Sequence, residues 1–451
     1  MRRTIATLAA VLALLAPASA SAAAAQAGPA DAAAGRPAPA APAPRPLIFV
    51  HGSGGSGAQF ESQAMRFSSN GYPDDRLAVH EYDSTFGINT IDQVWAGLDA
   101  LIADKLAATG ADKVDLAGHS LGTTVVQGYL ASSPERAARV AHYVNIDGRT
   151  ATALPGGVPT LAVWGEGNPA RAIVGAENYY APDQSHVQVA TSPETFAQMY
   201  RFLTGTPPAT TGIVAEKPGR VRISGKANLF PSNVGAAGTT LEIWRVKAST
   251  GERRGDHPRA TFTVAADGSW GPFAAVGGQP YELVLTRGDG SAHHFYFAPF
   301  VRSDQFVRLL TSEPGTGIDL LRDRSDHTTS LTITRYKEWW GDQGAQNDVL
   351  EVAGTDLATP ALAPRVKRVN AMFAFDDGVD GVTNLAAPIP ELFALPFISG
   401  ADLVIPATTP PDATVPVRMV SRTGGGAEQV INVRNWASAT DHITVQFPDY
   451  D

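Results

Sequence analysis

The chain has 451 residues, of which 44% are hydrophobic and 18% are charged, so it can form two or three folded domains and is too apolar for a disordered protein. Its formal net charge is −9 and no basic patch offsets it, which excludes nucleic acids and anionic lipid headgroups as electrostatic partners. The sequence contains no cysteine, so its stability cannot come from disulfide bonds.

The amino-terminal residues have the sections of a secretory signal. Arg2 and Arg3 precede an apolar run over residues 5–16, which is followed by small residues. A membrane-spanning helix needs about 20 apolar residues, so the run predicts a cleaved signal peptide over residues 1–22 and no transmembrane segment. Residues 23–45 are mostly Ala, Pro and Gly and are expected to form a linker. We therefore expect a secreted, extracellular protein.

Strands and helices alternate over residues 46–206, the predicted catalytic domain. In chain order the patterns predict a strand at 46–50, a helix at 58–69, a strand at 77–82, a helix at 90–109, a strand at 113–116, a helix at 121–131, and strands at 140–146, 160–164 and 177–181. This alternation is typical of an α/β fold with a doubly wound parallel sheet. The site of such a fold lies at the carboxyl ends of the strands.

Residues 114–130 predict a strand, a sharp turn and a helix, with Ser120 at the turn. Gly118 and Gly122 bracket this serine, because only small residues let the strand and the helix approach so closely. The helix that follows directs the backbone N–H of Leu121 towards a developing oxyanion. This pattern is the nucleophile elbow of an α/β-hydrolase.

A glycine-rich loop at residues 51–56 follows the first strand and includes Gly52 and Ser53. Such a loop either cradles a phosphate or supplies a backbone N–H to an oxyanion. The phosphate motif needs Gly-Lys-Ser/Thr, which the loop lacks, so we favour the oxyanion role for the N–H of Ser53. No cofactor is predicted.

A nucleophilic serine needs a histidine base, and the base needs an orienting carboxylate. His142 sits inside an apolar strand, whereas His186 lies in a loop after the last strand, which makes His186 the predicted base. Asp147 and Glu166 each follow a strand, and the residues alone do not decide between them as the acid.

Beyond residues 205–212 the pattern changes to short alternating strands separated by turns. The strands form two sets, which predicts an all-β region of sandwich or barrel type. The first set is expected to form a β-sandwich domain over residues 213–312. The second set is expected to form a lipid- or substrate-binding β domain over residues 313–451.

Four aromatic residues of the second β domain allow two interpretations. Trp339, Trp340, Phe393 and Phe397 either form an apolar patch that contacts lipid or fill a β core. The acidic loop 376–381 lacks the spacing and the closing glutamate of a calcium loop, so a plain turn and no metal site are predicted.

Stretches outside the elbow carry a resemblance to a known family. They include Phe49-Val-His-Gly52, Asn70-Gly-Tyr-Pro73, Ser132-Ser-Pro-Glu-Arg136, Thr191-Ser-Pro-Glu194 and Ser399-Gly-Ala-Asp-Leu-Val-Ile-Pro406. These stretches resemble the archaeal long-chain triacylglycerol lipases, α/β-hydrolases with a carboxyl-terminal β-barrel lipid-binding domain. The resemblance favours Asp147 over Glu166 as the acid. It implies a triad of Ser120, Asp147 and His186, with oxyanion N–H groups on Ser53 and Leu121.

The chain departs from this family at the lid. The archaeal lipases carry a long helical lid after the strand that matches residues 77–82, whereas here residues 83–89 lead almost directly to the next helix. A more exposed site is therefore expected.

The expected function is hydrolysis of acyl esters, with medium- to long-chain lipid esters as substrates, by a secreted serine esterase or lipase. Two alternatives remain open: an extracellular polyester depolymerase with the same triad, and a non-catalytic lipid-binding or surface-binding protein. The domain at residues 46–206 is long enough to fold alone, so we expect it to keep activity on short esters without the β region.

Overall fold

The computed structural model describes residues 43–448 and residue 450. The predicted signal peptide and most of the predicted linker lie outside the described residues. Pro44–Asp451 forms one unit of contacts, and the description below is confined to it. Within the described residues, no helix has the length and apolar character needed to cross a membrane.

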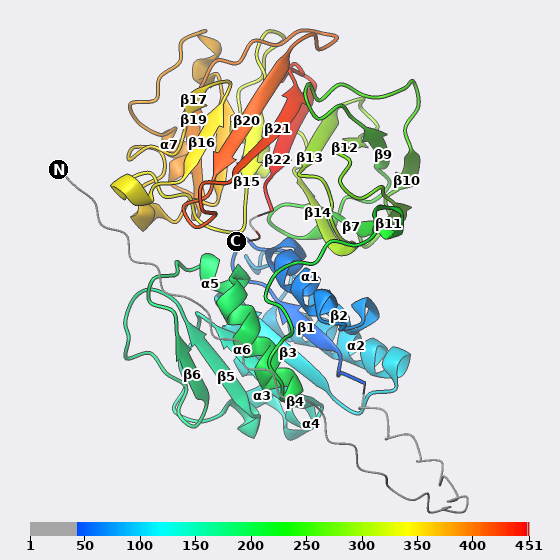
Figure 1. Cartoon of the computed structure of the whole chain (residues 1–451), viewed down its shortest axis with the longest axis vertical. Helices are drawn as coiled ribbons and strands as arrows, with labels where there is room; N and C mark the ends of the chain where they lie inside the picture. Colours follow the sequence, from blue (N-terminus) through cyan, green and yellow to red (C-terminus); the bar gives the residue numbers. More distant parts are fainter. Residues whose placement is uncertain (1–42, 449, 451) are drawn as a thin grey trace, which may run out of the picture. The chain divides into compact units, whose positions relative to one another are not determined.

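The first part of the chain forms a six-stranded parallel sheet in the order β2-β1-β3-β4-β5-β6 (Figure 1). Its strands are β1 (Leu47–Val50), β2 (Leu77–His80), β3 (Val114–His119), β4 (Val140–Ile146), β5 (Thr160–Trp164) and β6 (Glu177–Tyr180). β1, β3 and β5 are buried along their whole length, as expected for strands covered on both faces. The predicted doubly wound sheet is confirmed.

Helices cover both faces of this sheet. They are α1 (Glu61–Ser69), α2 (Ile91–Thr109), α3 (Leu121–Ser132), α4 (Pro134–Ala138), α5 (Gln188–Thr191) and α6 (Pro193–Thr204). Apolar side chains of α1 and α6 share one core with the sheet, and those of α2 and α3 share another. α2 begins at a capping box formed by Thr90 and Gln93 and ends at Gly110 with φ 66°, so local capping sets both of its ends.

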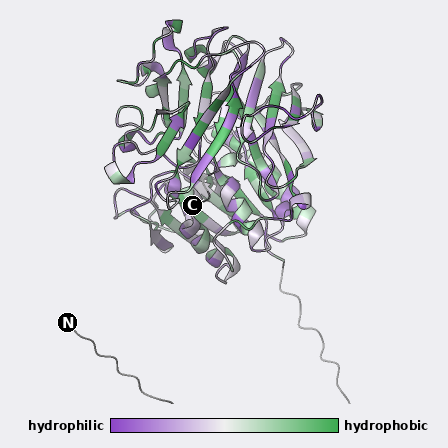
Figure 2. Cartoon of the chain, turned by 45° about the horizontal axis from the view of Figure 1, so that its top comes forward, coloured by the Kyte–Doolittle hydropathy of each residue, from purple (hydrophilic) through white to green (hydrophobic). Residues whose placement is uncertain are grey.

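Among the described residues, the β region contains sixteen further strands and one short α-helix, α7 (Pro390–Phe393). The strands are β7 (Arg222–Leu229), β8 (Val234–Gly235), β9 (Thr240–Arg245), β10 (Ala260–Thr263), β11 (Ser269–Ala274), β12 (Tyr281–Thr286), β13 (Ala292–Phe297), β14 (Asp304–Thr311), β15 (Leu331–Thr334), β16 (Val349–Val352), β17 (Thr355–Asp356), β18 (Ala371–Phe375), β19 (Ile398–Asp402), β20 (Thr414–Val420), β21 (Glu428–Arg434) and β22 (Asp441–Gln446). Many alternate between buried and accessible residues, and Figure 2 shows hydrophobic and hydrophilic residues mixed along them. The predicted all-β region is confirmed.

One sheet joins both predicted β domains. It has eight strands in the order β10-β9-β12-β13-β22-β15-β18-β19. β13 belongs to the first predicted β domain and β22 to the second, and these strands pair in parallel from Ala292↔Asp441 to Phe297↔Gln446. Each set of strands still has its own apolar core. The boundary predicted near residue 313 therefore separates two apolar cores, but the strands around these cores belong to one hydrogen-bonded sheet.

Candidate active site

Ser120 stands at the turn between β3 and α3 with φ 52° and ψ −120°. A positive φ is rare and costly for a residue with a side chain. A Cβ on Gly122 would lie 2.2 Å from the carbonyl oxygen of Val50, and a Cβ on Gly118 would lie 2.8 Å from that of Gly122. The two glycines thus permit the close contact of strand and helix that holds Ser120 at the carboxyl end of β3.

A series of hydrogen bonds leads from Ser120 to a buried carboxylate. Ser120 Oγ lies 2.9 Å from His186 Nε2, and His186 Nδ1 lies 2.6 Å from Asp147 Oδ2. The second carboxylate oxygen of Asp147 accepts the backbone N–H of Gly165 at 2.8 Å and lies 2.9 Å from Arg171 Nη1. Asp147 is 5% exposed and His186 is 9% exposed. Both oxygens of the acid are therefore occupied, and its orientation towards His186 is fixed.

The surroundings of Asp147 favour its charged form. Burial raises the pKa of this carboxyl, but the hydrogen bond and charge of His186, the N–H of Gly165 and the charge of Arg171 lower it by more. The pKa of Asp147 therefore lies below its usual range. Sequence reasoning missed Arg171, because it lies in an irregular loop that no motif marks.

The other candidates lie apart from Ser120. Glu166 Oε2 pairs with Arg365 Nη2 of the β region at 2.6 Å, so this alternative acid serves an ion pair between the two parts of the chain. His142 Nδ1 lies 2.9 Å from Asp115 Oδ1 on the neighbouring strand, which agrees with a structural histidine.

The loop with Gly52 and Ser53 lies directly against the serine. A Cβ on Gly52 would come within 2.9 Å of Ser120 Cβ, so only glycine allows this approach. Leu121 is the first residue of α3, immediately after Ser120. The backbone at Ser53 and Leu121 is thus close to the serine from two elements, an arrangement that can serve an oxyanion.

A cavity opens above Ser120 and His186, and its walls come from both parts of the chain. The β region supplies apolar walls through Phe230, Phe295, Leu310, Phe373, Phe397 and Ile398. Polar side chains of β13, β15 and β22 also face the cavity. The β region therefore supplies part of the wall around Ser120 and His186, which the short segment 83–89 did not predict.

Trp339 and Trp340 do not form a lipid-contacting patch, which corrects one of the two sequence interpretations. Trp339 is fully buried in the second β core, with the guanidinium of Arg335 3.8 Å from its ring centroid. Trp340 is 5% exposed and lies between Arg365 at 3.9 Å and Arg422 at 3.8 Å. These cation–π contacts and the core contacts explain why both rings are buried.

The two phenylalanines differ in position. Phe397 lines the cavity, and its ring stacks with that of His186 at a centroid distance of 6.1 Å. Phe393 is half-buried, with Lys367 Nζ 4.6 Å from its ring centroid, and does not line the cavity. In the acidic loop, Asp376 Oδ1 accepts the N–H of Gly381 at 3.2 Å, which closes a turn.

The parallel sheet, the turn at Ser120 and the β region define the class of protein, a lipase-like α/β-hydrolase with a carboxyl-terminal β region. Family models agree. The class 2 lipase model matches residues 44–133, the lipase C-terminal domain model matches residues 219–314, and a further C-terminal domain model matches residues 317–451. The lipase-like fold inferred from the sequence is thereby confirmed.

Similar solved structures include Bacillus licheniformis lipase BlEst2, with 16% identity over 36% of this chain and 94% of that chain (TM-score 0.28). Carboxylesterase CesB from Bacillus subtilis has 18% identity over 37% and 85% of the two chains (TM-score 0.28), and Aspergillus fumigatus lipase B has 15% identity over 37% and 54% (TM-score 0.29). No curated protein matches the chain. Likenesses this distant carry no argument about substrate or mechanism.

Proposed function

We propose that the chain is a secreted serine carboxylic-ester hydrolase that cleaves medium- to long-chain acyl esters of lipids. The observation that carries this proposal is the hydrogen-bonded series Ser120, His186 and Asp147 at the floor of a cavity with apolar walls. Secretion rests on the signal-like pattern of residues 1–22.

In the proposed mechanism, Ser120 Oγ attacks the ester carbonyl carbon while His186 Nε2 takes its proton. Asp147 holds the tautomer in which Nδ1 carries a proton, and its charge stabilises the imidazolium. The N–H groups of Ser53 and Leu121 hold the oxyanion. The alkoxide leaves with the proton from His186, and water then attacks the acyl-enzyme with His186 again as the base.

The cavity supports an aliphatic acyl group as substrate. Gln446, Thr444 and His442 alternate along β22 and all line the cavity, so it follows the strand for about 13 Å at roughly 3.3 Å per residue. Phe295 and Phe373 lie on the neighbouring part of the same sheet and also line the cavity. An acyl chain that packs against the apolar walls of this cavity leaves water at a gain of about 0.8 kcal/mol for each buried CH₂.

The test is a Ser120→Ala variant assayed with p-nitrophenyl esters from acetyl to palmitoyl, beside triolein emulsion and a polyester film. Loss of the nucleophile should lower the rate by several orders of magnitude on every ester, while circular dichroism shows a wild-type fold. Retention of more than about a tenth of the activity would contradict the proposal. Wild-type hydrolysis of the film without hydrolysis of triolein would replace lipids by polyesters as the substrate class.

A further inference from the structure

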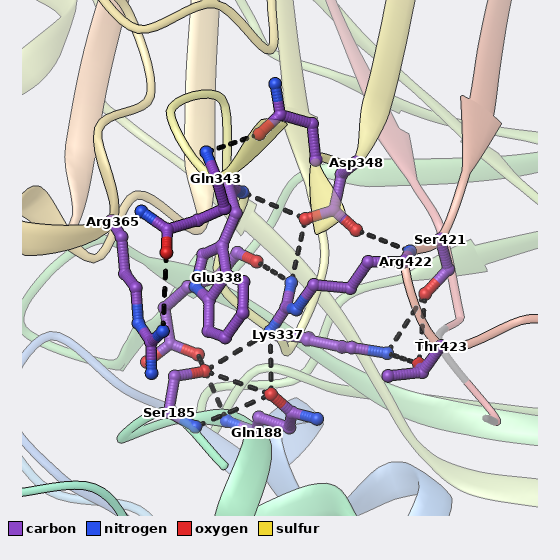
Figure 3. A network of polar contacts seen from close by, with 12 residues as sticks. Ser185, Gln188, Lys337, Glu338, Gln343, Asp348, Arg365, Ser421, Arg422 and Thr423 are labelled. Carbon is purple, nitrogen blue, oxygen red and sulfur yellow. Dashed lines mark hydrogen bonds and ion pairs between the residues drawn. The ribbon is translucent and has the colours of Figure 1, made fainter. Parts of the chain in front are cut away.

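A glutamate of the β region, Glu338, contacts Ser185 and Gln188 of the loop that carries His186, and Figure 3 shows these three side chains together. Glu338 is fully buried, and its carboxylate faces three donors on residues next to His186. Oε1 accepts the backbone N–H of Val187 at 2.6 Å, and Oε2 accepts that of Gln188 at 3.2 Å and the hydroxyl of Ser185. The carboxylate therefore contacts residues on both sides of the proposed base.

Glu338 is itself fixed by a buried ion network. Its backbone carbonyl accepts from Arg335 Nη2 and from Arg422 Nη1, each at 2.6 Å. Both guanidinium groups pair with Asp348, at 2.5 Å and 2.7 Å. Arg422 also donates to the side-chain oxygen of Gln188 at 2.6 Å. The network thus ties strands of the second β core to the loop of the base.

The hydrolase part also holds the same loop. His119 Nε2 lies 2.8 Å from the carbonyl oxygen of His186. Burial, together with the nearby His186, lowers the pKa of His119 to about 3, so His119 is neutral and donates through this one nitrogen. The backbone at His186 is consequently fixed from two directions, by His119 from the hydrolase sheet and by Glu338 from the β region.

We propose that Glu338 is a positioning residue that sets the angle of the His186 ring between Ser120 and Asp147. The inference rests on the proposed function and extends it, because it makes the β region part of the catalytic framework. A carboxylate suits this position because two of its partners are backbone N–H groups, which can only donate, and the third is the Ser185 hydroxyl, which donates to Oε2. A displacement of about 1 Å in a catalytic group costs about 100-fold in rate, so a small shift of this loop has a large effect.

The test is Glu338→Gln in the full chain, because the amide keeps the shape but turns an NH₂ group towards a donor. We expect kcat for p-nitrophenyl butyrate to fall about 10- to 100-fold with little change in KM. Inactivation by diisopropyl fluorophosphate, which requires the same attack by Ser120, should slow by the same factor. Titration of the active site with that reagent corrects for any unfolded fraction.

Glu61→Gln is the matched control. Glu61 is 6% exposed and its Oε2 accepts from Gln446 Nε2 of the β region at 3.0 Å, so it also bridges the two parts of the chain, without contacting the His186 loop. Its kcat should stay near the wild-type value. Equal kcat values for Glu338→Gln and Glu61→Gln would overturn the proposal.

Two further variants complete the design. If Glu338→Gln does not fold, Ser185→Ala removes one of the three donors through a small change, and it should lower kcat at unchanged KM. Wild-type kcat for Ser185→Ala would then overturn the proposal. Ser120→Ala separates the proposed serine mechanism from the proposed role of Glu338. Activity in Ser120→Ala would refute the serine mechanism. An inactive Ser120→Ala together with a fully active Glu338→Gln would refute only the positioning role of Glu338.

Discussion

Asp147 illustrates how much a single carboxylate depends on its contacts. Its two oxygens bind His186 on one side and Gly165 with Arg171 on the other. We expect Asp147→Asn to lower kcat by about 10⁴-fold, since the amide favours the wrong tautomer of the base. Glu166→Gln should remain close to wild type, because Glu166 contacts Arg365 and not His186. The measurement is kcat of both variants in steady-state kinetics. A larger loss of kcat in Glu166→Gln than in Asp147→Asn would assign the acid role to Glu166.

At the level of secondary-structure elements, three strands meet at a buried charge cluster. His294 of β13 lies 2.8 Å from Glu282 of β12 and 2.7 Å from Asp441 of β22, across the junction of the two β cores. Burial would raise the pKa of Glu282, but the hydrogen bond and charge of His294 and the charge of Arg253 lower it to about 2. For His294, burial lowers the pKa, while Asp441 and Glu282 raise it by more.

The signs of these shifts predict a pH dependence. A lowered pKa for Glu282 gives stability that is present above pH 4.5 and lost as the pH falls towards 2. The raised pKa of His294 gives stability that is present below pH 6.5 and lost as the pH rises through the folded value. In urea unfolding at pH 5, the free energy of unfolding of wild type should exceed that of Glu282→Gln by about 3 kcal/mol. This difference between the two proteins should be smaller at pH 2. A constant difference would contradict this account.

β18 offers a way to shorten the cavity. Ala371 lines it, and the backbone N–H of Ala371 bonds to the carbonyl of Phe397 at 3.2 Å, a contact that a substitution retains. Ala371→Phe should leave kcat/KM for acetyl esters near wild type. It should lower kcat/KM for long acyl esters by about 200-fold if four CH₂ groups lose burial at about 0.8 kcal/mol each.

The control for this prediction adds the same ring outside the cavity. Val382 is 59% exposed and does not line the cavity, so Val382→Phe should leave every ester unaffected. The measurement is kcat/KM against acyl length for both variants. A uniform loss over all lengths with Ala371→Phe would mean that the acyl chain takes another path.

Local patterns were sufficient to predict most of the hydrolase elements. The strands at Val140–Ile146 and Thr160–Trp164 have the predicted bounds, because continuous apolar runs between turns leave little ambiguity. The pairing of β13 with β22 could not be read from the sequence, since the partners lie about 150 residues apart and alternation does not encode a partner. The contact of Glu338 with Val187 could not be predicted for the same reason, because the two residues are 151 positions apart and no motif links them.

For the whole molecule, the structure changes what we expect of a chain that ends at Thr206. Phe306 of β14 is 3% exposed and packs in the hydrolase core, with its ring centroid 6.2 Å from that of Phe49. A truncated chain loses this ring and Glu338 together. It should melt at a lower temperature and lose activity on acetyl and palmitoyl esters alike. Circular dichroism and ester kinetics test this, and full acetyl activity in a folded truncated chain would limit the β region to binding acyl chains.

The contact of β22 with α1 has a consequence for biosynthesis. Gln446 bonds to Glu61 across a separation of 385 residues, and Arg66 Nη2 donates to the carbonyl of Tyr450 at 2.8 Å. At a translation rate of about 5 to 20 residues per second, α1 waits roughly 20 to 80 s for these partners. During most of that time the ribosome has not yet synthesised β22, which forms one wall of the cavity. A ribosome-bound chain therefore lacks this wall of the cavity until β22 has been synthesised.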